Sequence, residues 1–126
     1  MSVTSLFSIG VGGFFGAICR FFVANRLTVW LGSAFPYGTL AVNALGSLLL
    51  GFLSGYLVEH LTVNELVRMG VTIGFLGAFT TFSTFSYESV TFILHGDIVK
   101  AGANILANCA ICVTLCLLGV HLARSF

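Results

Sequence analysis

The side chains best suited to chemistry with an ion lie in one run of hydroxyl and aromatic residues, TTFSTFS at positions 80–86. Phe82 and Phe85 are three residues apart, so they share a face if the segment is helical. Aromatic rings carry a positive edge, and a ring edge attracts an anion that a ring face would repel. The alternative is that the two rings only pack. A neighbouring stripe is polar and consists of Thr81, Thr84, Glu88 and Thr91.

Two glycines, Gly74 and Gly77, come just before this run. Glycine and hydroxyl side chains that bond to the backbone are poor material for a continuous helix. The pattern therefore predicts a break from Gly77 to Thr80. At membrane depth, non-helical backbone is tolerated where it is buried in protein or lines a cavity, and its carbonyls can coordinate a cation such as Na⁺. The alternative is an intact helix whose hydroxyls bond to their own turn.

Amide side chains and one arginine lie inside other apolar segments. Asn43 offers donors that can bind an anion or bridge two helices, and bridging is the commoner use. Asn104, Asn108 and Cys112 recur every four residues, which predicts a polar stripe that forms either a pore wall or a seam between helices. Arg20 is too deep to be a loop residue, and it either fixes a helix end through carbonyl contacts or attracts anions.

The cysteines and histidines give no support to an enzyme or a metal-binding domain. Cys109 and Cys112 form a CxxC without a second ligand pair, so small membrane-buried residues are favoured over a zinc or redox site. The same holds for the other two cysteines, Cys19 and Cys116. Glu88 is the one acidic residue deep in an apolar segment, and His60, His95 and His121 lie at segment ends. No nucleophile, base and orienting group can be assembled from these residues.

The elements that must position these residues are membrane helices. Of the 126 residues, 58% are hydrophobic and 7% are charged, whereas soluble domains have about 25% charged residues. Apolar segments cover about residues 6–31, 37–58, 64–94 and 98–123, and about 20 apolar residues span a bilayer. Residues 1–126 are thus predicted to form a single all-α integral membrane domain of four transmembrane helices, the third broken near its middle. This composition leaves no room for a soluble catalytic domain and indicates no nucleic-acid partner.

The few basic residues also bear on topology, because lysine and arginine in short loops set orientation. One side of a four-helix arrangement holds Arg68 and Arg124, and the other holds Arg26 and Lys100. This balance predicts insertion in both orientations and an antiparallel homodimer. The alternative is that another signal orients the chain. No Lys or Arg precedes Arg20, so the first segment lacks the basic region of a signal peptide and is expected to remain in the mature protein.

Together these segments resemble the Fluc family of fluoride channels, also called CrcB. The resemblance covers GGFFGAICR at positions 12–20, Pro36, positions 38–46 and, most specifically, positions 74–86 with TTFSTFS. It implies a passive, fluoride-selective channel in the bacterial cytoplasmic (inner) membrane, built as an antiparallel homodimer with two pores. It also implies a role in exporting fluoride that enters as HF and dissociates in the cytoplasm.

The resemblance assigns roles to individual residues. Phe82 and Phe85 line the pores, Asn43 donates to the ion, and Na⁺ binds at the dimer centre on the backbone carbonyls of Gly77 and Thr80. The polar lining or vestibule has three further members: Ser83, Thr84 and Glu88. Asn108, in the fourth helix, is a further candidate for the fluoride path. Asn108 and Cys112 stand at polar positions that are often serine in the family, so their roles stay open. Fluoride loses much solvation on entering a pore, and donors such as these must replace the lost water.

One rival class has a similar four-helix, dual-topology design: proton-coupled exporters of small ions or of multiple drugs. The multidrug exporters rely on a carboxylate in the first helix, and the first segment here has none. A proton-coupled fluoride antiporter would need a titrating relay, for which Glu88 is the lone candidate.

Overall fold

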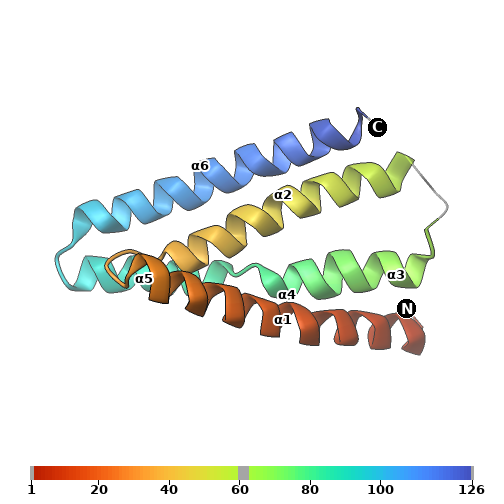
Figure 1. Ribbon diagram of the computed structural model, residues 1–126, viewed down its shortest axis with the longest axis horizontal. Coiled ribbons are helices and arrows are strands. Elements are labelled where there is room, and N and C mark those ends of the chain that lie inside the picture. The colour runs from red at the N-terminus through yellow and green to blue at the C-terminus, as the bar shows by residue number, and fades with distance from the viewer. Residues whose placement is uncertain (1, 60–62, 126) are drawn as a thin grey trace.

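The chain folds as a bundle of long helices in the computed structural model, which describes residues 2–59 and 63–125 (Figure 1). The elements are α1 (Val3–Leu31), α2 (Tyr37–Glu59), α3 (Glu65–Met69), the π-helix η1 (Gly70–Leu76), α4 (Gly77–Phe79), α5 (Phe82–Leu94) and α6 (Ile98–Ala123). Four stretches are apolar and long enough to cross a membrane, namely Val3–Leu31, Tyr37–Leu57, Glu65–Leu94 and Ile98–Ala123. The predicted all-α architecture with four membrane helices is confirmed, with ends shifted by a few residues.

The four crossings associate as two close pairs, α2 with α6 and α1 with η1. Glycine makes both approaches possible, because a Cβ atom on Gly12 would overlap the carbonyl oxygen of Gly70 in η1. In the other pair, a Cβ atom on Gly51 would overlap the carbonyl oxygen of Cys116 in α6. Such contacts suit membrane helices, which associate by packing because lipid supplies no hydrophobic drive between them.

The third crossing changes its backbone conformation twice. The wide turns of η1 lead into the short α4, and Thr80 and Thr81 are then extended, with φ/ψ of −86°/159° and −151°/112°. Figure 1 shows this segment as a thin coil between α4 and α5. Gly77 itself is helical, with φ −63° and ψ −34°. The extended residues therefore lie at the C-terminal edge of the range 77–80 and one position beyond it.

Both termini lie at one end of the bundle, with α3, while the α1–α2 and α5–α6 connections lie at the other (Figure 1). Arg68 in α3 and Arg124 after α6 belong to the first end. Arg26 near the end of α1 and Lys100 in the first turn of α6 belong to the second. These four basic residues, which exclude Arg20 inside the bundle, thus form the two equal groups on which the topology prediction depends.

Candidate functional site

The extended segment of the third crossing is held by the side chain of Asn43 in α2. The Thr81 N–H donates to Asn43 Oδ1 at 2.7 Å, and Asn43 Nδ2 donates to the Thr81 carbonyl at 3.0 Å. In an unbroken helix the Thr81 N–H would donate to the carbonyl four residues earlier, at Gly77. Asn43 Oδ1 therefore takes the place of the helical acceptor of the Thr81 N–H, and the Gly77 carbonyl is left without that donor.

Arg20 reaches the same segment from α1. Its Nη1 donates to the Thr80 carbonyl at 3.3 Å, and the side chain is half-buried. The guanidinium thus places positive charge beside the extended backbone. Asn43 and Arg20 together satisfy polar backbone groups that would be costly to leave unpaired inside a membrane.

A row of buried amides continues from Asn43 across the bundle. Asn43 Nδ2 donates to Asn108 Oδ1 at 3.0 Å, and Asn108 Nδ2 donates to Asn104 Oδ1 at 2.9 Å. Asn104 Nδ2 then donates to Ser89 Oγ at 2.9 Å, and Ser89 donates to the Phe85 carbonyl at 2.9 Å. Asn104 has no exposed surface. The row links α2, α6 and α5, so Asn104 lies in a seam between helices.

Ser89 was missed by reasoning from the sequence, although it is buried and accepts from Asn104. It follows Glu88 and lies five residues beyond Thr84, so it falls off the polar stripe that begins at Thr81. Its partner is 15 residues away in another helix, and no local spacing signals that pairing.

A cavity of about 350 Å³ opens beside the extended segment. Its lining combines two aromatic rings with amides, hydroxyls, thiols and aliphatic side chains: Asn43, Ser47, Leu50, Thr80, Thr81, Phe82, Phe85, Asn108, Cys109, Cys112 and Val113. None of these residues carries a formal charge. The cavity brings together five of the predicted site residues: Asn43, Phe82, Phe85 and Asn108, predicted for the fluoride path, and Thr80, predicted for sodium.

The two phenylalanines differ in their surroundings. Their ring centroids are 5.2 Å apart at an interplanar angle of 64°, an edge-to-face arrangement. Phe85 is 6% exposed, whereas Phe82 is 77% exposed. Phe85 therefore belongs to the interior of the single chain, and Phe82 presents its ring beyond it.

The hydroxyls at the start of α5 form a cluster around Thr81. Thr81 Oγ1 donates to Thr84 Oγ1 at 2.9 Å, accepts from the Thr84 N–H at 3.2 Å, and lies 3.4 Å from Ser83 Oγ. Both Ser83 and Thr84 are exposed. They border the extended segment but are not among the residues that line the cavity.

Glu88 lies in a different place from the cavity. Thr39 Oγ1 donates to Glu88 Oε1 at 2.6 Å, while the buried Oε2 has no hydrogen-bond partner among the described residues. Glu88 lines a separate hollow of about 310 Å³ by the α1–α2 connection, together with Ser33 and Tyr87. The structure thus does not bring Glu88 into contact with the space beside Phe82 and Phe85.

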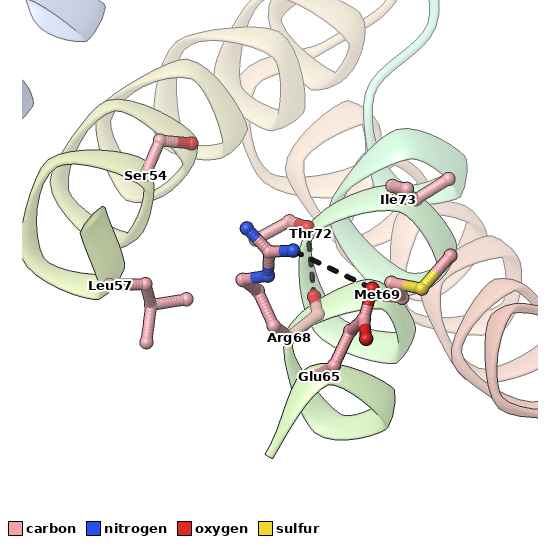
Figure 2. Close-up of a pocket in the computed structure, with 7 residues that line it drawn as sticks. All are labelled: Ser54, Leu57, Glu65, Arg68, Met69, Thr72 and Ile73. Carbon is pink, nitrogen blue, oxygen red and sulfur yellow. Dashed lines mark hydrogen bonds and ion pairs between the residues drawn. The ribbon is translucent and has the colours of Figure 1, made fainter. Parts of the chain in front are cut away.

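A third hollow separates α2 from α3 and η1, and Figure 2 shows the side chains that line it. Arg68 Nη2 lies 4.0 Å from Glu65 Oε1, and both side chains are exposed. Thr72 Oγ1 donates to the Arg68 carbonyl at 2.8 Å. Exposed ion pairs of this kind contribute about 0–1 kcal/mol, and the nearby acid offsets the charge of Arg68. This hollow offers little attraction for a small anion.

The bundle and the uncharged polar cavity define a multi-pass helical membrane protein. Residues 7–120 match the family described as CrcB-like protein, Camphor Resistance (CrcB), and the chain belongs to this family. A relative from Syntrophotalea carbinolica is 48% identical over 117 residues, which cover 93% of this chain and 95% of that protein. One from Photobacterium profundum is 47% identical over 94% of both chains.

A third relative, from Methylococcus capsulatus, is 45% identical over 95% of this chain. The chain spans 53% of the length of that longer protein. All three relatives carry the name fluoride-specific ion channel FluC.

Proposed function

We propose that this chain forms a passive channel for fluoride, with the cavity beside Thr81 as part of the ion path. The observation that carries the proposal is the lining of that cavity, which combines Phe82 and Phe85 with the amides of Asn43 and Asn108 and has no charged residue. Neutral donors and ring edges attract an anion without holding it as tightly as a fixed charge would. The names of the relatives support fluoride as the ion and a channel, which is not an enzyme, as the class.

The hydrogen bonds suggest how fluoride receives its donors. Both Nδ2 hydrogens of Asn43 are engaged, one by the Thr81 carbonyl and one by Asn108. We infer that the ion takes over the hydrogen bond to Asn108, since the bond to Thr81 holds the extended backbone. The Asn108 oxygen must then turn away, because a carbonyl oxygen repels an anion.

The proposed working form is an antiparallel homodimer with two ion paths. Phe82 is 77% exposed in the single chain, and a second copy would supply the missing wall of each path. The equal division of basic residues between the two ends supports insertion in both orientations. Fluoride that has entered the cytoplasm as HF would leave through this dimer in the cytoplasmic membrane.

Sodium is proposed as a structural ion at the dimer centre, on the carbonyls of Gly77 and Thr80. Carbonyl oxygens of interrupted membrane helices suit this hard cation, and the Gly77 carbonyl has lost its usual donor to Asn43. Arg20 already donates to the Thr80 carbonyl, so sodium would share that oxygen with a positive group. Binding of sodium at this position therefore requires a second chain that contributes the same two carbonyls.

Efflux from liposomes that contain the purified protein tests the function. With a potassium gradient and valinomycin setting the potential, fluoride efflux should be fast, should follow the potential, and should exceed chloride efflux by at least about tenfold. A fluoride flux that ignores the potential and follows the proton gradient would instead indicate a proton-coupled exporter. No flux above that of empty liposomes would refute the proposal.

A further inference from the structure

Two thiols of α6 line the same cavity as the phenylalanine pair. Cys109 is exposed and Cys112 is half-buried, and both belong to the lining of the space beside Thr81. The other two cysteines, Cys19 and Cys116, do not line it. The CxxC therefore stands out from the remaining cysteines by its position.

The spacing of the pair suits one ion held between two sulfurs. Side chains three residues apart on a helix have Cβ atoms about 5–6 Å apart and face the same way. Metal–thiolate bonds are about 2.3 Å long for zinc, so two sulfurs on opposite sides of one ion are about 5 Å apart. Within residues 2–59 and 63–125 no cluster of three His, Cys, Asp or Glu side chains could hold a metal. The ion must then be one that accepts two sulfur ligands.

Charge further restricts the ion. Thiolates select soft cations, and two thiolates neutralise one divalent cation. A neutral complex is favoured at this depth, because an uncompensated charge in the membrane interior is expensive. A soft monovalent cation would leave one negative charge, and the cavity lining includes no basic residue to balance it.

We propose that Cys109 and Cys112 form a binding site for a soft divalent cation of the mercuric type, and that its occupancy blocks the ion path. In the binding step two S–H bonds break and both protons pass to water. Two ligands of the incoming metal, water or chloride, are released, and two metal–sulfur bonds form without any change of oxidation state. The second half of this proposal rests on the proposed function, since it requires fluoride to pass through the same cavity.

Binding is tested on the full-length protein with mercuric chloride, followed by a wash with the monothiol 2-mercaptoethanol. Mercury on a single thiol is exchanged in the wash, whereas a bridged ion is retained because its second sulfur acts at high effective concentration. Mass spectrometry should show one retained mercury per chain. In Cys109→Ser and Cys112→Ser, the 2-mercaptoethanol concentration that removes the mercury should be at least about tenfold lower than in the parent. The matched controls Cys19→Ser and Cys116→Ser should behave as the parent. If Cys109→Ser or Cys112→Ser (the two cavity variants) retained mercury as the parent does, the bridged site would be overturned.

Block is tested by fluoride efflux from liposomes treated in the same way, with each variant compared with its own untreated rate. The parent and both control variants should lose most of their flux, and the two cavity variants should need at least about ten times more mercury. Retained mercury with undiminished efflux would overturn the block and place the path elsewhere. A parent without fluoride flux would instead refute the proposed function, and the mass measurement would still decide the site.

Discussion

Asn43 makes three hydrogen bonds that join the third crossing to α6. Asn43→Asp removes the Nδ2 donor and leaves the Thr81 carbonyl and Asn108 Oδ1 without it, at a cost of about 1–3 kcal/mol for each buried group. The substitution should therefore lower the stability of the chain as well as its fluoride flux. We expect fluoride efflux to fall at least about tenfold and the thermal unfolding temperature to drop.

The matched control is Asn25→Asp, because Asn25 is exposed near the end of α1. It introduces the same carboxylate and should leave both efflux and unfolding temperature close to the parent. If Asn43→Asp matched this control in both measurements, the hydrogen bonds between Asn43 and Thr81 would have no importance for function or folding.

Phe82 and Phe85 allow packing to be separated from ion contact. Phe85→Ile should lower both stability and flux, because the ring is 6% exposed, and such a core change typically costs about 1–2 kcal/mol. Phe82→Ile should lower flux with little change in the stability of the chain, because the ring is 77% exposed. Size-exclusion chromatography and unfolding curves measure assembly and stability, and liposome efflux measures transport. Parental efflux from both variants, as intact dimers, would remove the two rings from the path.

At the scale of helices, glycine contacts decide whether α1 and η1 can meet. Gly12→Val should disrupt this pair, because its Cβ would overlap the Gly70 carbonyl oxygen, and overpacking typically costs about 1–3 kcal/mol. Gly10→Val is the control two positions earlier in the same helix, since a Cβ there would meet no atom within 4 Å. Unfolding curves in detergent should separate the two variants. Equal stability would mean that the helices do not approach as closely as described.

Gly77 illustrates a limit of local sequence reasoning. Its position before the threonines placed it at the start of the predicted break, where a substitution such as Gly77→Val would disturb the third crossing. Gly77 is exposed and helical, and an added Cβ would meet only the Thr72 carbonyl oxygen, at 4.0 Å. Within the single chain this substitution is therefore expected to be tolerated. A loss of flux with normal folding would indicate that Gly77 faces the second copy, whereas unchanged flux would argue against the proposed sodium site.

The four crossings could be predicted because hydropathy and length are local properties of the chain. The pairings at the site could not, because Asn43 meets Thr81 and Asn108 across 38 and 65 residues. The spacing of Asn104 and Asn108 predicted their shared face but left open whether it was a pore wall or a seam. Packing answers this for Asn104, which bonds to Ser89. Glu88 was assigned to the polar stripe that begins at Thr81, but its hydrogen bond from Thr39 holds it beside the hollow near the α1–α2 connection and away from the cavity.

At the scale of the whole molecule, the balance of basic residues predicts insertion in both orientations. The double variant Ser33→Lys, Ala34→Lys adds two charges to the exposed α1–α2 connection, and His121→Lys, Ser125→Lys adds two at the opposite end. Because positively charged ends stay in the cytoplasm, each variant should insert in one orientation, and the two orientations should be opposite. Labelling of a C-terminal tag from each side of the membrane measures the result.

Fluoride efflux should then require the two double-lysine variants to be present together. Either variant expressed alone should lose most fluoride efflux, since an antiparallel dimer needs one copy of each orientation, and co-expression of the two should restore it. This rescue separates a topological defect from local damage by the new lysines, because damaged chains would stay inactive together. Full activity of either variant alone, with its tag confined to one side, would show that a single orientation suffices and would rule out the antiparallel dimer.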